Sequence, residues 1–409
     1  MRKTHMFMMT FLCFLMIPVF SHAEEKKEYI SGQYEYVLLD DGTAQITRYN
    51  GSAERVEIPD VLDGHQVTSL EGIVFMDCYI NLKSVTLPDS ISYIDCNPFY
   101  LCSAEVKVSQ NHPYLAVADD ILYSKPDKKI IYCWTSEEIL EIPDGIIGIA
   151  DNNTFDGCAN LTRVILPESM SEIECNPFKW KNIEIKVSPD HPCFAVIDGI
   201  MYNKLEKKIV YCPVSIEEVE IPEGIRAVGD NAFDACDNLK SIVLPDGTKS
   251  IGDFAFANCD NLENVVFPDG LTHIGKNVFY NSAHIINVNI PDSITRINDD
   301  MFSCCESLTY ITLPEGLTCI GKYAFNCCRS LTYITLPERL TSIEEGAFRC
   351  CDNLKEMVLP DSITDIGKDA FSDCDNLNII VSRNSYAADY CKENNLNYTY
   401  PDANDWLNE

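Results

Sequence analysis

The chain has 409 residues and a formal net charge of −32 at pH 7, because 63 Asp and Glu residues outnumber 31 Lys and Arg residues. Such an excess of negative charge argues against binding to nucleic acid and against attachment to anionic lipid through a basic surface. Apolar residues make up 46% of the sequence, so the chain can bury a large core.

Residues 1–23 are predicted to be a secretory signal peptide. A basic start is followed by an apolar run over 6–19, which is too short to span a membrane. The small residues Ser21 and Ala23 predict cleavage after Ala23. We therefore expect a secreted or cell-surface protein whose mature chain has no membrane span.

Residues 24–58 are predicted to form an N-terminal cap. Two alternating apolar runs flank the sequence DDGT at 40–43, which is typical of a β-hairpin, and Gly42 can supply the positive φ that such a turn needs. This hairpin would cover the exposed edge of the repeats that follow it.

Residues 59–221 contain two long units that are copies of each other at a spacing of 79 residues. Each unit spans 55 residues, which is 32 more than the repeat described below. Both end in a predicted β-hairpin, ILYSKPDKKIIYC at 121–133 and IMYNKLEKKIVYC at 200–212. His112 and His191 occupy matching places in the two copies. We interpret them as turn residues duplicated with the insert rather than as metal or acid–base ligands.

Residues 222–381 repeat with a fixed period of 23 residues, and such a period is typical of a solenoid. In the unit PEGLTCIGKYAFNCCRSLTYITL at 314–336, counting the proline as position 1, apolar residues recur at positions 4, 7, 12, 18, 21 and 23. The alternation at the end of the unit predicts a half-buried strand, which the next proline terminates. We expect these strands to pair in parallel from coil to coil. The prolines that begin the units are Pro222, Pro245, Pro268, Pro291, Pro314, Pro337 and Pro360.

The segments LKSIVLPDGTKSIGDFAFANC (239–259) and LTYITLPEGLTCIGKYAFNCC (308–328) resemble the treponemal-type leucine-rich repeat of BspA-like bacterial surface proteins. The resemblance covers nearly all of the chain after the leader. It implies a β-rich repeat solenoid with a short irregular or helical convex side. We expect about eleven coils, two of which carry the 32-residue hairpin inserts.

Residues 382–409 are predicted to form a C-terminal cap and an acidic tail. Ser385 can cap a helix of about ten residues over 387–396, with Ala388 and Cys391 on its inner face.

The cysteines recur at one position per coil, which predicts a ladder of small buried residues rather than a disulfide framework. Side chains stacked in this way are separated by roughly the coil spacing, which exceeds the Cβ separation that a disulfide prefers. A second, more exposed ladder one residue earlier (Cys304, Cys327 and Cys350) is the better place for a disulfide or a metal, although we expect no metal site. The position-15 ladder comprises Cys236, Cys259, Cys305, Cys328, Cys351 and Cys374, with Ser282 in its one gap.

The sequence shows no catalytic motif of the HExxH, GxSxG, Walker or GxGxxG type, so we expect neither an enzyme nor a cofactor. Acidic pairs such as Asp299-Asp300 and Glu344-Glu345 lack the spaced oxygen ligands of a calcium loop and are interpreted as solvated surface.

Positions 20 and 22 of each coil are predicted to point to solvent from a concave sheet, because they alternate with core positions 21 and 23. Tyrosine stacked above tyrosine, beside threonine, would give an aromatic and hydroxyl patch suited to an interface. Ordinary cross-strand packing is the alternative interpretation. The candidate binding residues are Tyr310, Thr312, Tyr333, Thr335, Asn287, Asn289, Asn264 and Glu356.

We therefore predict an exported, non-catalytic protein that mediates adhesion or recognition, and the family resemblance implies a host or bacterial surface protein or glycan as partner. A monomer is expected. Two alternatives remain open. One is a polysaccharide-active enzyme or inhibitor that uses the hairpins near 99–138 or 178–217, and the other is a self-associating structural component of the surface.

Overall fold

The repeat unit folds into one turn of a solenoid that carries two short strands and one side of tight turns. The computed structural model describes residues 27–78, 81–94 and 96–401, so the predicted signal peptide lies outside them. These residues form a β-solenoid of about 15 turns with a period near 23 residues. The predicted solenoid is confirmed, but eleven coils was too low because each long unit supplies more than one turn.

The strand at the end of each unit, at positions 20 to 22, pairs in parallel with its equivalents and forms what we call the outer ladder. Along these strands the middle residue is buried and its neighbours are exposed, as the alternation predicts. The strands are β4 (Arg55–Glu57), β7 (Ser84–Thr86), β9 (Glu105–Lys107), β13 (Ile139–Glu141), β15 (Arg163–Ile165), β16 (Glu184–Lys186), β21 (Ser241–Val243), β23 (Asn264–Val266), β25 (Asn287–Val288), β27 (Tyr310–Ile311), β29 (Tyr333–Ile334), β31 (Glu356–Val358), β33 (Asn378–Ile380) and β34 (Tyr398–Thr399).

A second strand at positions 6 and 7 forms the inner ladder, which the sequence analysis did not predict. It also pairs in parallel from turn to turn, so the opposite side of the coil is not simply irregular or helical. Its strands are β3 (Ala44–Tyr49), β6 (His65–Leu70), β8 (Tyr93–Ile94), β12 (Lys129–Cys133), β14 (Gly148–Ile149), β19 (Lys208–Tyr211), β20 (Ala227–Val228), β22 (Ser250–Ile251), β24 (His273–Ile274), β26 (Arg296–Ile297), β28 (Cys319–Ile320), β30 (Ser342–Ile343) and β32 (Asp365–Ile366).

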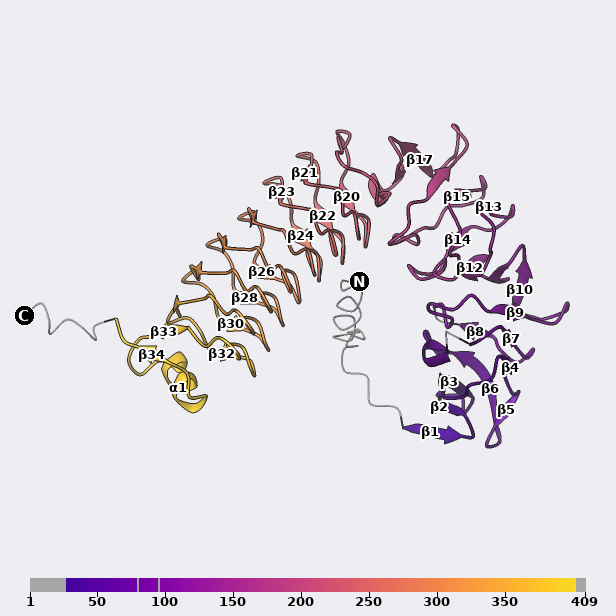
Figure 1. Cartoon of the computed structure of the whole chain (residues 1–409), viewed down its shortest axis with the longest axis horizontal. Helices are drawn as coiled ribbons and strands as arrows, with labels where there is room; N and C mark the ends of the chain where they lie inside the picture. The colour runs from indigo at the N-terminus through magenta and orange to yellow at the C-terminus, as the bar shows by residue number, and fades with distance from the viewer. Residues whose placement is uncertain (1–26, 79–80, 95, 402–409) are drawn as a thin grey trace, which may run out of the picture.

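The turns stack into an arc, and the outer ladder follows its convex side. Figure 1 shows β21, β23 and β33 toward the outer edge of the arc, with β22, β24 and β32 nearer its inside. The prediction that positions 20 and 22 line a concave face is therefore wrong. Alternation determines which side chains leave the coil, but the direction of curvature depends on which side stacks its turns more closely, and the alternation does not encode that.

The third side of each coil is a run of tight turns over a stack of phenylalanines. Position 12 is phenylalanine in successive coils, and the rings of Phe302, Phe325 and Phe348 are nearly parallel, with centroids 5.4 and 5.3 Å apart. Backbone hydrogen bonds join the coils beside them, as from Phe325 N to Ala347 O at 2.8 Å. Each ring therefore packs on the one before it, and no coil can bury its own ring alone.

The predicted N-terminal hairpin is present and continues into the solenoid. Strands β1 (Glu28–Ser31), β2 (Tyr34–Leu38) and β3 are antiparallel, and Gly42 adopts a φ of 81° in the turn before β3. Strand β3 then pairs in parallel with β6, against which β5 (Val61–Leu62) folds back. The hairpin thus covers the first edge, and a short 3-10 helix, η1 (Met76–Cys78), follows in the next turn.

The duplicated inserts form the predicted hairpins, but the second strand of each belongs to the inner ladder. In the first copy β10 (Leu115–Ala118), β11 (Ile121–Ser124) and β12 are antiparallel, and β12 pairs in parallel with β14. The second copy repeats this with β17 (Phe194–Ile197), β18 (Ile200–Asn203), β19 and β20. Tyr132 and Tyr211 sit beneath these hairpins, and the buried core is divided there into three clusters.

The C-terminal helical cap is also confirmed, although the helix has eight residues and ends at Glu393, three residues before the predicted end. Helix α1 (Tyr386–Glu393) begins after Ser385, whose hydroxyl accepts a hydrogen bond from Ala388 N at 3.1 Å. Ala388 and Cys391 are buried against the last coil, as predicted. None of the helices in the described part of the chain has the length and apolar character needed to cross a bilayer.

The cysteines at position 15 are free thiols that donate to the preceding coil. Cys305 Sγ lies 3.2 Å from Phe279 O, and Cys328 Sγ lies 3.1 Å from Phe302 O. Ser282 makes the equivalent bond to Phe256 O at 2.8 Å. Position 15 therefore requires a small, buried donor, which explains why serine replaces cysteine there.

We expect Cys328→Ser to keep stability within about 1 kcal/mol of the parent, because serine supplies the same donor at nearly the same volume. Cys328→Leu should cost about 1–3 kcal/mol, since the site is fully buried and overpacking forces its neighbours apart. Urea unfolding followed by circular dichroism measures both. Equal losses in the two variants would contradict this role for the thiol.

Candidate interaction surface

The predicted binding residues lie together on the outer ladder and point away from the core. Tyr310 and Tyr333 are register partners on β27 and β29 and are 49% and 59% exposed. Asn264 pairs with Asn287 in the same way, and Asn289 bridges to Thr312. Thr335 Oγ1 donates to Tyr333 Oη at 3.0 Å. The structure brings these side chains into two adjacent rows, although it places those rows on the convex side.

The feature that sets this region apart is the absence of charge. Ten successive outward positions of β21 to β29, which we call the outer strip, are apolar, amide, hydroxyl or tyrosine side chains. In a chain of net charge −32, such a run needs little desolvation when covered. The outer strip consists of Ser241, Val243, Asn264, Val266, Asn287, Asn289, Tyr310, Thr312, Tyr333 and Thr335. Glu356, also a predicted site residue, follows Tyr333 in register and ends the strip.

The outer ladder of the first half of the chain is different, because its outward positions carry charges of both signs. Arg163 on β15 pairs with Glu184 on β16 at 2.6 Å, and Glu105 on β9 pairs with Lys107 at 3.2 Å. The charges of each pair neutralise each other, either between neighbouring strands or along one strand. The uncharged strip is therefore a property of the C-terminal half and not of the repeat itself.

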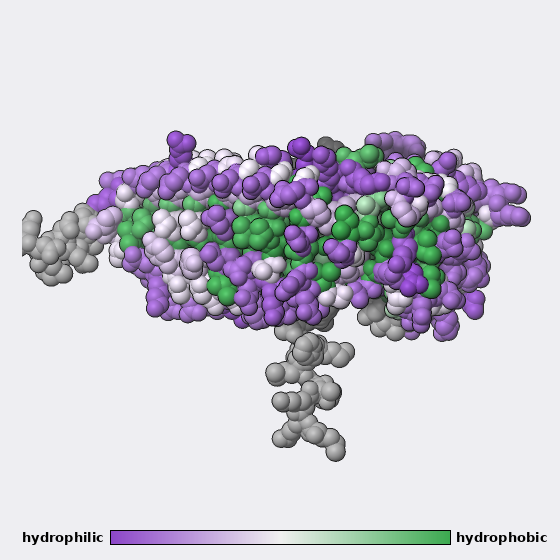
Figure 2. Space-filling model, turned by 90° about the horizontal axis from the view of Figure 1, so that it is seen from above, coloured by the Kyte–Doolittle hydropathy of each residue, from purple (hydrophilic) through white to green (hydrophobic). Residues whose placement is uncertain are grey.

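The outer face also exposes apolar side chains in an interrupted band along its middle. Figure 2 looks onto this face from above and shows hydrophobic residues along its middle, with hydrophilic residues on both sides. Val243, Val266 and Val358 at position 22 are 63%, 52% and 55% exposed. Interface centres combine apolar area and tyrosine with few charges, and this band has the same composition.

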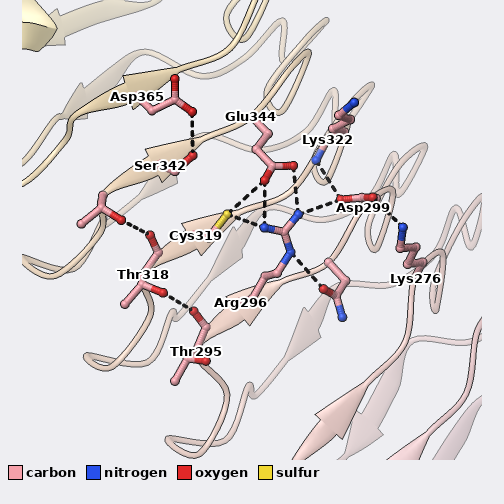
Figure 3. Close-up of polar contacts among 12 residues, drawn as sticks. Lys276, Thr295, Arg296, Asp299, Thr318, Cys319, Lys322, Ser342, Glu344 and Asp365 are labelled. Carbon is pink, nitrogen blue, oxygen red and sulfur yellow. Dashed lines mark hydrogen bonds and ion pairs between the residues drawn. The ribbon is translucent and has the colours of Figure 1, made fainter. Parts of the chain in front are cut away.

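The inner ladder holds a polar network that includes Asp299 and Glu344, so the interpretation of these two acids as solvated surface is wrong. Figure 3 shows Arg296 on β26 reaching across two turns to Glu344, with nitrogen to oxygen distances of 2.8 and 2.9 Å. Arg296 also donates to Asp299 at 3.0 Å, and Lys276 pairs with the other oxygen of Asp299 at 3.0 Å. The sulfur of Cys319 lies between Arg296 and Glu344.

The electrostatics of this network indicate a structural role. The hydrogen bond from Arg296 lowers the pKa of Glu344, and ion pairing outweighs burial to lower the pKa of Asp299. Burial raises the pKa of Cys319 to about 11, so its thiol stays protonated at neutral pH and is a poor nucleophile. The arginine thus ties three turns together. Threonines on the same face also link successive turns, because their hydroxyls donate to backbone carbonyls of the preceding turn. Thr318 Oγ1 donates to Thr295 O at 3.1 Å.

His112 and His191 are turn residues, as predicted. Each is fully buried, and in each ring Nδ1 accepts backbone N–H groups while Nε2 donates to a proline carbonyl 3.0 Å away. With both ring nitrogens occupied by the backbone, neither histidine can act as a metal ligand or a general base.

The exposed cysteine ladder does not form a metal site. Cys304, Cys327 and Cys350 are free and half-buried at position 14. Across the residues that the structure describes, no group of three or more His, Cys, Asp or Glu side chains could hold a metal ion.

Carboxylates near the first insert also serve the fold. Asp151 accepts hydrogen bonds from Asn97 N at 2.6 Å and Asn153 N at 2.7 Å, which joins the two turns on either side of the hairpin. Burial raises the pKa of Asp156 to about 6. Because Asp151 accepts both backbone N–H groups, its carboxylate serves the fold and is not free to bind a ligand.

Two parallel strands per turn, a buried apolar residue (most often leucine) before each corner and a stack of coils with a period near 23 residues define a leucine-rich-repeat solenoid. The chain belongs to the BspA type leucine-rich repeat family, whose model matches in six copies over residues 49–117, 128–191, 203–308 and 272–397. Among curated proteins, no sequence matches the chain.

Solved structures of bacterial leucine-rich-repeat proteins are similar to the chain. A leucine-rich repeat protein from Eubacterium ventriosum is 22% identical, with 85% of this chain and 95% of that chain covered and a TM-score of 0.57. A leucine rich cell surface protein from Faecalibacterium prausnitzii is 23% identical, with 90% and 97% covered and a TM-score of 0.41. The pneumococcal vaccine antigen PcpA is 18% identical, with 92% and 98% covered and a TM-score of 0.44. The likeness to the first of these supports the fold alone.

We expect Arg296→Met to destabilise the protein by about 1 kcal/mol at pH 7. Because Arg296 lowers the pKa of Glu344 in the folded protein, the pair stabilises the fold above the ordinary pKa of that carboxyl group. This contribution disappears as the pH falls through the lowered value. The difference in melting temperature between parent and variant should therefore shrink from pH 7 to about pH 3.

The matched control is Arg349→Met, which removes a more exposed pair with Asp373 at 3.4 Å and should change the melting temperature less. A difference for Arg296→Met that stays constant with pH would show that lost packing, and not the ion pair, is responsible.

Proposed function

We propose that the chain is a non-catalytic recognition protein and that the outer strip is its binding surface. The observation that carries this proposal is the unbroken run of uncharged, partly apolar side chains from Ser241 to Thr335 in a chain of net charge −32. A face that exposes tyrosine and valine without charge loses little hydration free energy when a partner covers it. Membership of a repeat family built as a scaffold is consistent with this use.

The fold favours binding because the strip is preformed. Its side chains stand on two sheets, β21 to β25 and β27 to β34, which the bridge between Asn289 and Thr312 joins. The residues between these side chains are buried in a continuous core. Little backbone entropy is therefore lost when a partner docks, and the binding free energy is not spent on ordering a loop.

The partner we propose is a surface protein or glycan, of a host or of another bacterium, met outside the cell. The signal peptide predicted over 1–23 and the BspA-like character of the repeats support this location. One structural relative is itself described as a cell surface protein. We further propose that adhesion or recognition at the surface is the biological outcome and that the chain acts as a monomer.

The test is a binding screen of residues 24–409 against immobilised matrix proteins, plasma proteins and glycans. We expect saturable binding that falls at least tenfold in Tyr310→Ala/Tyr333→Ala, because the pair provides the largest exposed rings of the strip. Tyr114→Ala is the matched control, since Tyr114 is 40% exposed but lies in the first insert.

Circular dichroism should show both variants folded. Equal binding by the double variant and the parent would remove the outer strip from the proposal and direct attention to the hairpins. If no ligand in the panel binds while the protein self-associates at low micromolar concentration, a structural role at the surface would replace recognition.

A further inference from the structure

We infer that the partner of the outer strip is a cationic protein, which docks a lysine- or arginine-rich segment along the strip and against a row of carboxylates at its edge. This inference rests on the proposed function of the strip and names the class of its partner. The row, which we call the acidic row, occupies position 2 in seven successive coils. Its members are Glu223, Asp246, Asp269, Asp292, Glu315, Glu338 and Asp361.

The acidic row lies directly beside the outer strip. Each member follows position 22 of the outer ladder after one buried residue and the proline, and each is exposed. Glu223 and Asp361 extend the row by one coil beyond the strip at either end. In Figure 2 hydrophilic residues border the apolar band along its length. The other border is of mixed sign, because position 19 carries Lys240, Glu263 and Lys355. A docked segment would thus meet a negative charge at every turn on one side.

The carboxylates of the acidic row have no partner within the described residues. Other acids of the same coils are engaged, such as Asp299 with Lys276 and Arg296, or Asp352 with Arg329. No ion pair or hydrogen bond involves a side chain of the row within that part of the chain. These charges are therefore available to an external group.

The backbone bond that closes the corner does not depend on the acidic side chain of position 2. An acid follows the proline in the first half as well, as Asp60, Asp89, Asp144 and Glu168. The corner is closed by the backbone, as from Thr248 N to Pro245 O at 2.9 Å and from Leu271 N to Pro268 O at 3.1 Å. Asparagine and serine suit such corners as well as aspartate does, yet neither occurs in the row, whereas glutamate occurs three times. The property that the seven positions share is negative charge.

The carboxylates of neighbouring coils in the acidic row repel one another, and a cationic partner would reduce this repulsion. Paired strands lie about 4.8 Å apart, which is less than the Debye length of about 8 Å at physiological ionic strength. Each carboxylate therefore repels the carboxylates of the adjacent coils through incomplete screening. A segment that places ammonium or guanidinium groups along the row removes this repulsion and gains attraction.

The strip and the row select the same kind of chemistry. Lysine and arginine have long apolar stems that can cover Val243 and Val266, while their cationic ends reach the row. The exposed rings of Tyr310 and Tyr333 can also accept a cation over their faces. A second copy of the chain would instead bring another net charge of −32 against the first, which opposes association.

The experiment titrates a fluorescein-labelled 12-residue peptide of alternating lysine and valine into residues 24–409 and follows fluorescence anisotropy at low and physiological salt. The row variant is Asp246→Asn/Asp269→Asn/Asp292→Asn/Glu315→Gln. The charge-matched control neutralises four exposed acids of the insert turns and the C-terminal helix, Asp119→Asn/Asp198→Asn/Asp389→Asn/Glu393→Gln. A glutamate–valine peptide of equal length serves as the negative probe.

We expect the lysine–valine peptide to bind saturably, at least fivefold more weakly to the row variant, and within twofold of the parent to the control. Tyr310→Ala/Tyr333→Ala should weaken it as well. Equal weakening in the row variant and the control would reduce the effect to overall net charge and overturn the inference. So would parent-like binding by the row variant, or no peptide binding at all. If the screen described above still finds a ligand that depends on Tyr310 and Tyr333, the proposed function survives that failure and the partner is not cationic.

Discussion

The structure depends on the pairing of backbone groups between successive turns. Backbone hydrogen bonds join each coil to the next at both ladders and along the third side, so the turns must have the same length and the same corners. The phenylalanine stack and the donor at position 15 make the same demand on side chains, since Cys328 reaches the carbonyl of Phe302 one turn earlier. A coil that departs from the pattern loses bonds on two sides at once. The surface is free to vary, and its variation carries the information about function.

Two kinds of departure from the pattern have different meanings. The duplicated inserts enlarge the coil but return their last strand to the inner ladder, so they extend the scaffold without opening it. The network around Arg296 replaces small or neutral residues by a charged cluster that bridges three turns. Neither departure creates reactive groups, because the histidines of the inserts are occupied by backbone and the thiol of Cys319 is held in its protonated form. The outer strip differs from both, since it departs from its surroundings by lacking charge.

Much of the fold could be predicted because the period and the apolar positions are explicit in the sequence. Pro314 to Leu336 identifies the strand, the corner, the buried ring and the thiol ladder. Three features were missed, for physical reasons. The second ladder is two residues per turn, too short to show alternation, and the curvature is a collective property of the stack. The third is the Arg296 network, for which a signal was present. Position 8 is glycine in Gly252, Gly275 and Gly321, where the carboxylate and backbone of an aspartate in the preceding coil leave no room for a Cβ. Where position 9 of the preceding coil is lysine instead of aspartate, position 8 is Asn298 or Glu344, and its side chain occupies the inner face.

The division of the core into three clusters determines which part of the chain supports the outer strip. The clusters meet at the two insert hairpins, and the stretch from Ile200 to Cys391 has one core of its own. In a linear repeat protein, unfolding propagates through neighbouring interfaces and stops where coupling is weak. The whole outer strip is backed by this last cluster. The apolar backing of the strip therefore does not include the N-terminal half of the chain, and damage confined to that half leaves this backing in place.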